Sequence, residues 1–264
     1  LKIKGGDAIA KYDLSIGIKS DQGQLLATGY DKYFARLNSD VNLSRKLRFY
    51  STVLMAYHTY KVHEQGMLNA TNPLLAAMKK GPVFSPWQKD NENRLLPDLA
   101  IIRDEDNKLI VNNSVSNPLA LVNSLDAREH GYDVQMNAGL NYQLNDALTL
   151  KGLAGIYYYL SRQNVFVPGI TNRTIMPLSN GLAINTVRSA EGTTYNRYYQ
   201  LGADYHTQID DQQRLQASVH SQLIMNSMEY DAGTGYNTAN DFYKTLNNVT
   251  SASRSYFGYH QLWN

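Results

Sequence analysis

Apolar and polar side chains alternate along much of this chain, over stretches longer than the five or six residues of an average strand. The clearest stretch covers residues 132–143, where every second residue is apolar and the residues between them are polar or glycine. After a short polar turn at 145–147 the alternation continues over 148–160. Two long alternating runs joined by a tight turn predict an antiparallel hairpin with long arms.

The same unit recurs along the sequence, and we expect roughly eight strands of a length that suits a tilted membrane crossing. Besides the hairpin, the expected strands cover residues 12–18, 33–43, 47–58, 199–209, 215–225 and, with a weaker pattern, 253–263. The fold class predicted from this pattern is all-β.

Short and long connections alternate strictly between these strands. The short ones cover residues 44–46, 145–147 and 210–213, and the long ones lie near 20–30, 63–131, 162–193 and 229–252. This order places all short turns at one end of the sheet and all long loops at the other. Outer-membrane β-barrels have this asymmetry, with short periplasmic turns and long extracellular loops.

The apolar faces of the expected strands avoid charge, as a surface in contact with lipid requires, because Lys or Arg at the bilayer midplane costs about 2 to 4 kcal/mol. Arg197 is the exception, and it lies near a loop end from which its side chain can reach the interface. Tyr132 and Tyr142 stand at the two ends of one apolar face, as in aromatic girdles. The polar faces carry Arg36, Arg48, Lys151, Tyr157, Asp204 and His206.

A soluble β-sandwich would show the same alternation with its apolar side chains in a dry core. Strand length and loop asymmetry favour the membrane instead. The interpretation would be wrong if Val134, Met136, Leu148 and Ile156 lay inside a compact interior.

Composition excludes several classes of protein. The 264 residues carry 25 Lys and Arg against 23 Asp and Glu, so the basic field of a nucleic-acid-binding protein is missing. The sequence has 0 Cys, which excludes disulfides, thiol nucleophiles and cysteine metal sites. No run approaches the roughly 18 apolar residues of a membrane helix.

The ends of the chain bear on barrel closure. The sequence opens at Leu1 and stops inside the last expected strand. Unpaired strand edges in hydrocarbon cost several kcal/mol for each backbone group, so a membrane sheet must close. Eight strands can close alone around a packed interior, but the abrupt ends favour an internal segment of a larger barrel.

Seven short motifs carry a resemblance to a known family. They are GGD at residues 5–7, KYDLSIGI at 11–18, QGQ at 22–24, TGYDKYFARLN at 28–38, TNPLLAAM at 71–78, NPLA at 117–120 and YFG at 256–258. With them the chain resembles the SusC/RagA-type TonB-dependent transporters of Bacteroidetes outer membranes.

The resemblance implies a barrel of about 22 strands, of which residues 1–264 would form part of one β-barrel domain. The plug domain, the TonB box and the closing strands would lie outside this chain. It further implies energised import of glycan or peptide nutrients across the outer membrane of a Gram-negative bacterium. The implied partners are a SusD-like surface lipoprotein, the TonB complex, membrane lipid and the glycan or peptide ligand, with no nucleic acid.

Two groups of polar residues invite a metal-binding interpretation. Asp204, His206 and His220 share the polar faces of two neighbouring strands. Alternation alone gives no ligand geometry, so the simpler interpretation is that these side chains face water in a channel. The acidic run at 103–108 lacks the glycine and the final glutamate of an EF-hand loop, which favours a solvated turn.

The long stretch 63–131 contains two further features. Residues 73–80 read as one or two helical turns, with Pro73 near the start and Gly81 just past the end. Trp87 follows two prolines, and it either stacks on a sugar or anchors its own loop. We assign no substrate-binding residue from the sequence.

No G-x-S-x-G, Walker A, H-E-x-x-H or G-x-G-x-x-G motif is present, so the sequence predicts neither an enzyme nor a catalytic, cofactor or metal site. Three hypotheses stay open: a wall segment of a TonB-dependent importer, a non-transport outer-membrane barrel with a role in adhesion or assembly, and a fragment of a soluble β-sandwich or propeller.

Overall fold

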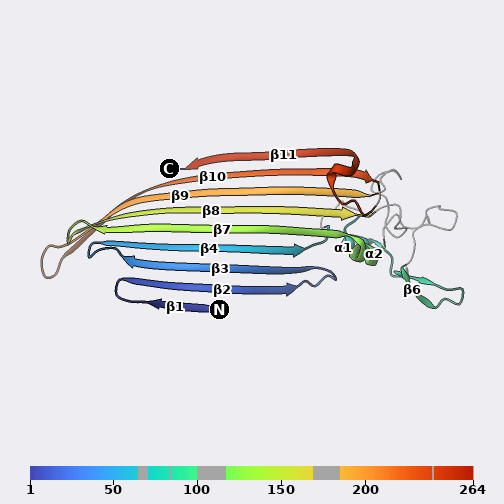
Figure 1. Cartoon of the computed structure of the whole chain (residues 1–264), viewed down its shortest axis with the longest axis horizontal. Helices are drawn as coiled ribbons and strands as arrows, with labels where there is room; N and C mark the ends of the chain where they lie inside the picture. The colour runs from blue at the N-terminus through green and yellow to red at the C-terminus, as the bar shows by residue number, and fades with distance from the viewer. Residues whose placement is uncertain (65–70, 84, 100–116, 169–184, 240, 264) are drawn as a thin grey trace.

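One antiparallel sheet dominates the computed structural model, which describes residues 1–64, 71–83, 85–99, 117–168, 185–239 and 241–263. In this part of the chain nine strands follow the order β1-β2-β3-β4-β7-β8-β9-β10-β11, so each strand pairs with the next long strand along the chain (Figure 1). Their bounds are β1 Lys2–Gly6, β2 Ala10–Gln22, β3 Gly29–Asn42, β4 Leu47–Lys61, β7 Asp126–Gln143, β8 Leu148–Val167, β9 Thr186–Gln208, β10 Arg214–Thr238 and β11 Val249–Trp263. The all-β prediction is confirmed, and β1 adds a ninth strand to the eight expected.

Several strands extend further than the sequence pattern predicted. β8, β9 and β10 have 20, 23 and 25 residues. β8 and β9 therefore take both ends of the predicted loop at 162–193, and β10 and β11 take most of the one at 229–252. The loop predicted at 20–30 shrinks to the residues between β2 and β3. These strand ends lie beyond the alternating stretches, and the backbone ladder between β8, β9 and β10 continues there without the alternation.

The tight turns lie together at one end of the sheet, on the left of Figure 1. In four of them a side chain at the first position accepts hydrogen bonds from backbone N–H groups two and three residues later. The accepting residues are Asp7, Ser44, Asn145 and Asp210, with distances of 2.8 to 3.2 Å. This bonding satisfies the turn backbone locally and explains the residue types found there.

Two short helices stand at the opposite end: α1, Pro73–Lys79, and α2, Pro118–Ser124. Both begin with an Asn-Pro pair in which Asn72 or Asn117 caps the first turn through its side chain. The helix predicted at 73–80 is confirmed. The helices pack on the ends of β7 and β8 in the main buried apolar cluster, which consists of Ala76, Ala120, Leu121, Ala127, Val165 and Val167.

The remaining elements also lie at the loop end. β5, Trp87–Lys89, and β6, Leu95–Leu99, form a separate two-stranded sheet, and a 3-10 helix spans Leu246–Asn248. Within the described residues, no helix has the length and apolar character needed to cross a bilayer.

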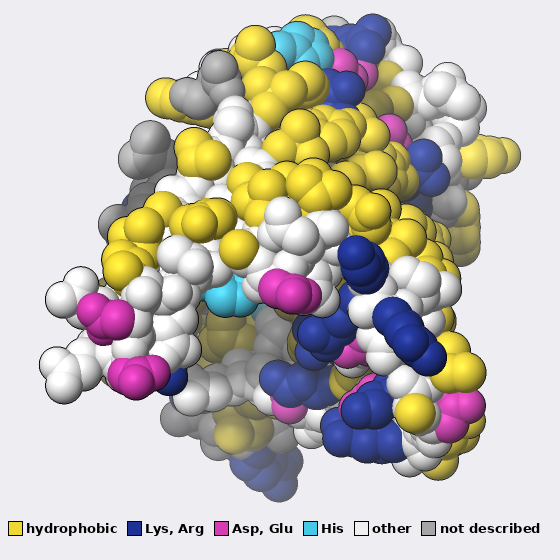
Figure 2. All heavy atoms as spheres, turned by 90° about the vertical axis from the view of Figure 1, so that its left-hand side faces the viewer, with side chains coloured by type: hydrophobic (Ala, Val, Ile, Leu, Met, Phe, Trp, Pro, Cys, Tyr) yellow, Lys and Arg dark blue, Asp and Glu magenta, His cyan; other side chains and the backbone are white. Residues whose placement is uncertain are grey.

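The sheet is arched and has two different faces. One apolar row crosses five strands in direct register, through Leu14, Leu37, Val53, Met136 and Ile156. Met136 and Ile156 are each 38% exposed, and Val134 and Leu148 are half-buried. Figure 2, seen from the turn end, shows hydrophobic side chains over the convex side and Lys and Arg gathered below the arch. The apolar faces therefore look outward, as predicted, and do not form a compact core. The expectation that Arg197 lies near a loop end is wrong, because it stands in the middle of β9, directly opposite Ile156 in the outward row.

Candidate functional site

The concave face carries an aromatic and acidic cluster near the loop end, which we call the tyrosine–histidine cluster. Its members come from β3, β4, β7 and β8, and each occupies a position that alternates with the outward apolar residues. The cluster consists of Tyr30, His58, Tyr60, Glu129, Asp133, Tyr157 and Tyr159.

His58 is the centre of this cluster and is only 4% exposed. It lies opposite Gly131 of β7, and a Cβ added at Gly131 would overlap the His58 Nε2 atom. The missing side chain therefore lets the imidazole lie over the neighbouring strand. The ring stacks on Tyr159, with ring centres 5.8 Å apart, and meets Tyr60 edge-on at 5.2 Å.

Two carboxylates complete the cluster. Asp133 Oδ2 lies 3.3 Å from His58 Nδ1, and Tyr157 donates its hydroxyl hydrogen to the other Asp133 oxygen at 3.3 Å. Tyr159 donates to Glu129 Oε1 at 3.4 Å. Ring faces beside carboxylate acceptors suit a ligand that offers both an apolar face and hydrogen-bond donors.

A cavity of about 450 Å³ adjoins the cluster and shares Glu129 with it. Its floor is formed by side chains of β8, β9 and β10, and its wall by the segment after β4. Arg188 forms an ion pair with Glu64 across the cavity; Glu64 is 14% exposed and Arg188 29%. The volume falls in the range of small-ligand pockets, which is about 300 to 1,000 Å³.

The metal candidates of the sequence come together only in part. Asp204 forms an ion pair with Lys151, and His220 Nε2 lies 3.4 Å from the second Asp204 oxygen. Among the residues that the structure describes, no three His, Asp or Glu side chains are arranged to hold a metal ion. The acidic run at 103–108 lies outside the described residues.

Trp87 is half-buried in β5. The carbonyl of the preceding Pro86 accepts a hydrogen bond of 2.7 Å from Asn117 Nδ2, which fastens this hairpin to the start of α2. This hydrogen bond does not involve the Trp87 side chain, so both roles of Trp87 stay open.

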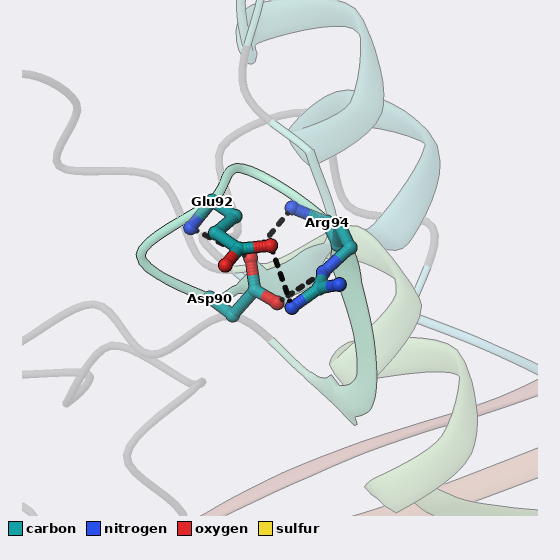
Figure 3. Close-up of polar contacts among 3 residues, drawn as sticks. All are labelled: Asp90, Glu92 and Arg94. Atoms are coloured by element: carbon teal, nitrogen blue, oxygen red, sulfur yellow. Dashed lines mark hydrogen bonds and ion pairs between the residues drawn. The ribbon is translucent and has the colours of Figure 1, made fainter.

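The tip of the β5–β6 hairpin holds a second group of charges, shown in Figure 3. Arg94 contacts the Asp90 and Glu92 carboxylates at 2.8 Å each. The hydrogen bond from the Arg94 side chain, together with backbone N–H groups, holds the pKa of the Asp90 carboxyl below its usual value. All these bonds close the turn on itself, so this group has a structural role.

The sequence pattern predicted that Tyr157 lies on a polar face but indicated no role for it. The pattern did not predict that these seven side chains meet in one cluster. The signal that identifies the cluster is the register between β4 and β7, which are separated by residues 62–125. The loop predicted at 63–131 is shorter at its end, because β7 already begins at Asp126. The Tyr-Tyr-Tyr run at 157–159 was visible in the sequence, yet its direct partners on β7 were not.

Comparison with solved structures shows which known fold this chain resembles. No protein-family model matches the sequence, and no curated protein matches it. Among solved structures, the chain is similar to a RagAB peptide transporter, with a TM-score of 0.74 at 15% identity over 99% of this chain. It is also similar to the RagAB peptide importer in its "closed-closed" and "open-open" states, each with a TM-score of 0.73 at 16% identity. The chain spans 28% of the length of those chains, so its nine-stranded sheet has the fold of one part of them.

Proposed function

We propose that residues 1–264 form part of the β-barrel domain of a TonB-dependent outer-membrane importer of glycan or peptide nutrients. The observation that carries this proposal is the outward apolar face on a sheet that has the fold of part of the RagAB importer. The convex side has side chains as exposed as Leu201, at 72%, and Val219, at 69%. A large contiguous apolar surface is costly in water and favourable in lipid.

The limits of the apolar face match a bilayer. Tyr57 and Tyr132 pair directly at its loop end, and Tyr142 and Tyr205 lie on the same face toward the turn end. Tyrosines at both borders of an apolar band are the girdles of membrane barrels, where the ring meets acyl chains and the hydroxyl meets water. This arrangement supports a location in the outer membrane.

The open edges of the sheet support a larger barrel. β1 and β11 are its two outermost strands and do not pair with each other in the described part of the chain. In β11 every described residue after Val249 is exposed. Edges like these are stable in hydrocarbon only when paired, because each unpaired backbone group costs several kcal/mol. We infer that both edges pair with further strands of the barrel wall.

The concave face would then border the transport path. The loops, together with a SusD-like lipoprotein, would capture the ligand outside the cell. The ligand would then pass the tyrosine–histidine cluster when a plug moves under the action of TonB. The plug and the TonB box belong, on this proposal, to parts of the importer outside this chain. The name of the RagAB transporter supports a peptide ligand, and the tyrosine rings beside carboxylates support a glycan equally well.

An uptake assay on the complete protein that carries this sequence tests the proposal. Cells that express it should accumulate a fluorescent oligosaccharide or oligopeptide, and accumulation should stop when the proton gradient is collapsed. Binding at the cell surface without energy-dependent accumulation would contradict import and support the alternative, a non-transport barrel in adhesion or assembly. A protein that dissolves as a monomer without detergent would contradict both.

A further inference from the structure

A group of basic side chains lies on the convex face just beyond the tyrosine border at the loop end. Tyr57 and Tyr132 are paired in the outward row, so the residues two and four positions further along β4 and β7 also face outward. Those positions, with their neighbours on β8 and on the loop before β11, hold the group that we call the basic patch: Lys61, Arg128, His130, Arg162 and Lys244.

The register of the sheet brings like charges together in this patch. Lys61 lies directly opposite Arg128, so two cationic side chains meet across these strands, and Arg162 lies one pair further along, directly opposite His130. Two cations in direct cross-strand positions destabilise a sheet unless an anion lies between them. Asp126 offsets part of this repulsion through Arg128, and a bound anion would offset the rest at Lys61.

The patch contains more positive than negative groups. Asp126 is shared by Arg128 at 2.9 Å and Lys244 at 3.0 Å, and Arg162 meets Glu191 at 2.6 Å. Four cations thus face two carboxylates, and Lys61 has no carboxylate within ion-pair distance among the described residues. The side chains are accessible, since Arg128 is 60% exposed, Arg162 57% and Lys244 47%.

The tyrosine border also orients the patch. His130 Nδ1 is hydrogen-bonded to the Tyr57 hydroxyl at 2.9 Å, and the two rings are nearly parallel. Tyr57, which marks the end of the apolar band, is thereby hydrogen-bonded to His130, the first residue of the basic patch beyond it. In a barrel wall this level is that of the lipid headgroups, immediately outside the acyl chains.

We propose that the basic patch binds the phosphate groups of an anionic lipid in the outer leaflet of the membrane. The inference rests on the proposed function, because it requires the convex face to lie in a bilayer with the loop end outside. Guanidinium groups match phosphate oxygens in geometry and charge, and cations just beyond a membrane span attract anionic headgroups. A lipid is the fitting occupant because the patch is continuous with the apolar face, so one molecule can contact both.

The same level of the sheet offers a matched control. Arg254 also faces outward near the loop end and forms an ion pair with Asp231, and it is 73% exposed. Its surroundings are acidic, since Glu191, Glu229 and Asp231 line the same outward depression. The substitution Arg254→Gln removes one exposed positive charge at this level of the sheet, but at a position outside the patch.

The test is lipid binding to the complete protein in non-ionic detergent, measured by native mass spectrometry and by thermal shift. The probes are bisphosphorylated lipid A, its dephosphorylated form, and inorganic phosphate. The wild-type protein should retain the phosphorylated lipid and be stabilised by it. The double substitution Lys61→Gln with Arg162→Gln should weaken this binding by about tenfold or more, and Arg254→Gln should leave it unchanged.

Three outcomes would overturn the inference. The first is equal binding of the dephosphorylated lipid, and the second is an equal loss of lipid binding in the Arg254→Gln variant. The third is displacement of the lipid by inorganic phosphate at equal concentration, which would indicate a site for a free anion. The unfolding temperature of each variant without lipid shows whether it is folded. Failure of the proposed function would appear separately, as solubility without detergent, whereas failure of this inference would leave an intact membrane protein without phosphate selectivity.

Discussion

Aromatic rings lie over glycines of the neighbouring strand at several positions of the concave face, two of them between β4 and β7. His58 faces Gly131, and Tyr50 faces Gly139, with no space for a Cβ at either glycine. Because the rings occupy the space of the missing side chains, they cover the concave face without projecting fully from it. Side chains at these glycines would push the rings inward.

The substitution Gly131→Ala tests this packing. The added Cβ would displace the buried His58 and break its stacking on Tyr159, so we expect a loss of about 1 to 3 kcal/mol in unfolding free energy. Gly152→Ala is the control, because the nearest atom to its new Cβ is Leu201 Cδ2 at 3.7 Å. Thermal unfolding of both variants in detergent measures the difference, and equal stability of the two would refute the role of the glycine.

The charge of Asp133 gives a second prediction at this scale. Asp133→Asn keeps the size of the side chain but removes the carboxylate that faces His58 and Tyr157. If ligand passes this cluster, the concentration for half-maximal uptake should rise several-fold, while the amount of protein in the membrane stays constant. Asp204→Asn, on the same face but paired with Lys151 toward the turn end, should have no such effect. The same response in both variants would mean that the cluster has no special role.

Sequence periodicity predicted the facing of single residues well, because a strand alternates strictly. Val134, Met136 and Tyr157 lie on the predicted sides. It could not predict that Gly131 accommodates His58, because this requires the register between two strands that lie far apart in the sequence. The Lys61 and Arg128 pair in the basic patch was hidden for the same reason.

At the scale of elements, the tight turns are held by side chains as well as by backbone. Asn145 Oδ1 accepts hydrogen bonds from Ala147 N and Leu148 N, at 2.9 and 2.8 Å. The polar turn residues therefore set where β7 ends and β8 begins. Turns of this kind were predictable from composition, since Asn, Asp and Ser favour local bonds to the backbone.

The substitution Asn145→Ala removes both bonds at once. We expect a loss of about 1 kcal/mol in unfolding free energy, the usual contribution of a hydrogen bond of this type. Asp146→Ala, one residue further along in the same turn, serves as the control because the structure gives the Asp146 side chain no hydrogen bond within the described residues. Denaturant titration in detergent compares the two, and an Asp146→Ala variant that loses as much stability would argue against the side-chain contribution.

Strand ends were the least predictable elements. β10 continues to Thr238 through residues such as Gly233 and Gly235 that have low strand propensity. Hydrogen bonds to β9 and β11 on both sides hold this segment extended. Pairing with the neighbouring strands therefore makes this segment a strand, although the local preference of its glycines favours a loop.

The whole molecule is an arched, open sheet whose two faces differ in chemistry. Alternation, strand length and loop order were sufficient to predict this architecture, because a wall between lipid and water imposes one simple pattern on every strand. The number of strands in the barrel that we propose, and the ligand that we propose for it, are not properties of this pattern. They depend on how β1 and β11 pair and on the loops outside the described residues.

The central claim, that the convex face touches lipid and the concave face touches water, is tested most directly by spin labelling. The sequence has 0 Cys, so single cysteines can be placed at 134, 135, 136 and 137 of the complete protein in liposomes. Labels at 134 and 136 should be relaxed by oxygen dissolved in lipid, and labels at 135 and 137 by a water-soluble nickel chelate, with a period of two. Equal accessibility at all four positions, or labels at 134 and 136 shielded from both reagents, would contradict the account.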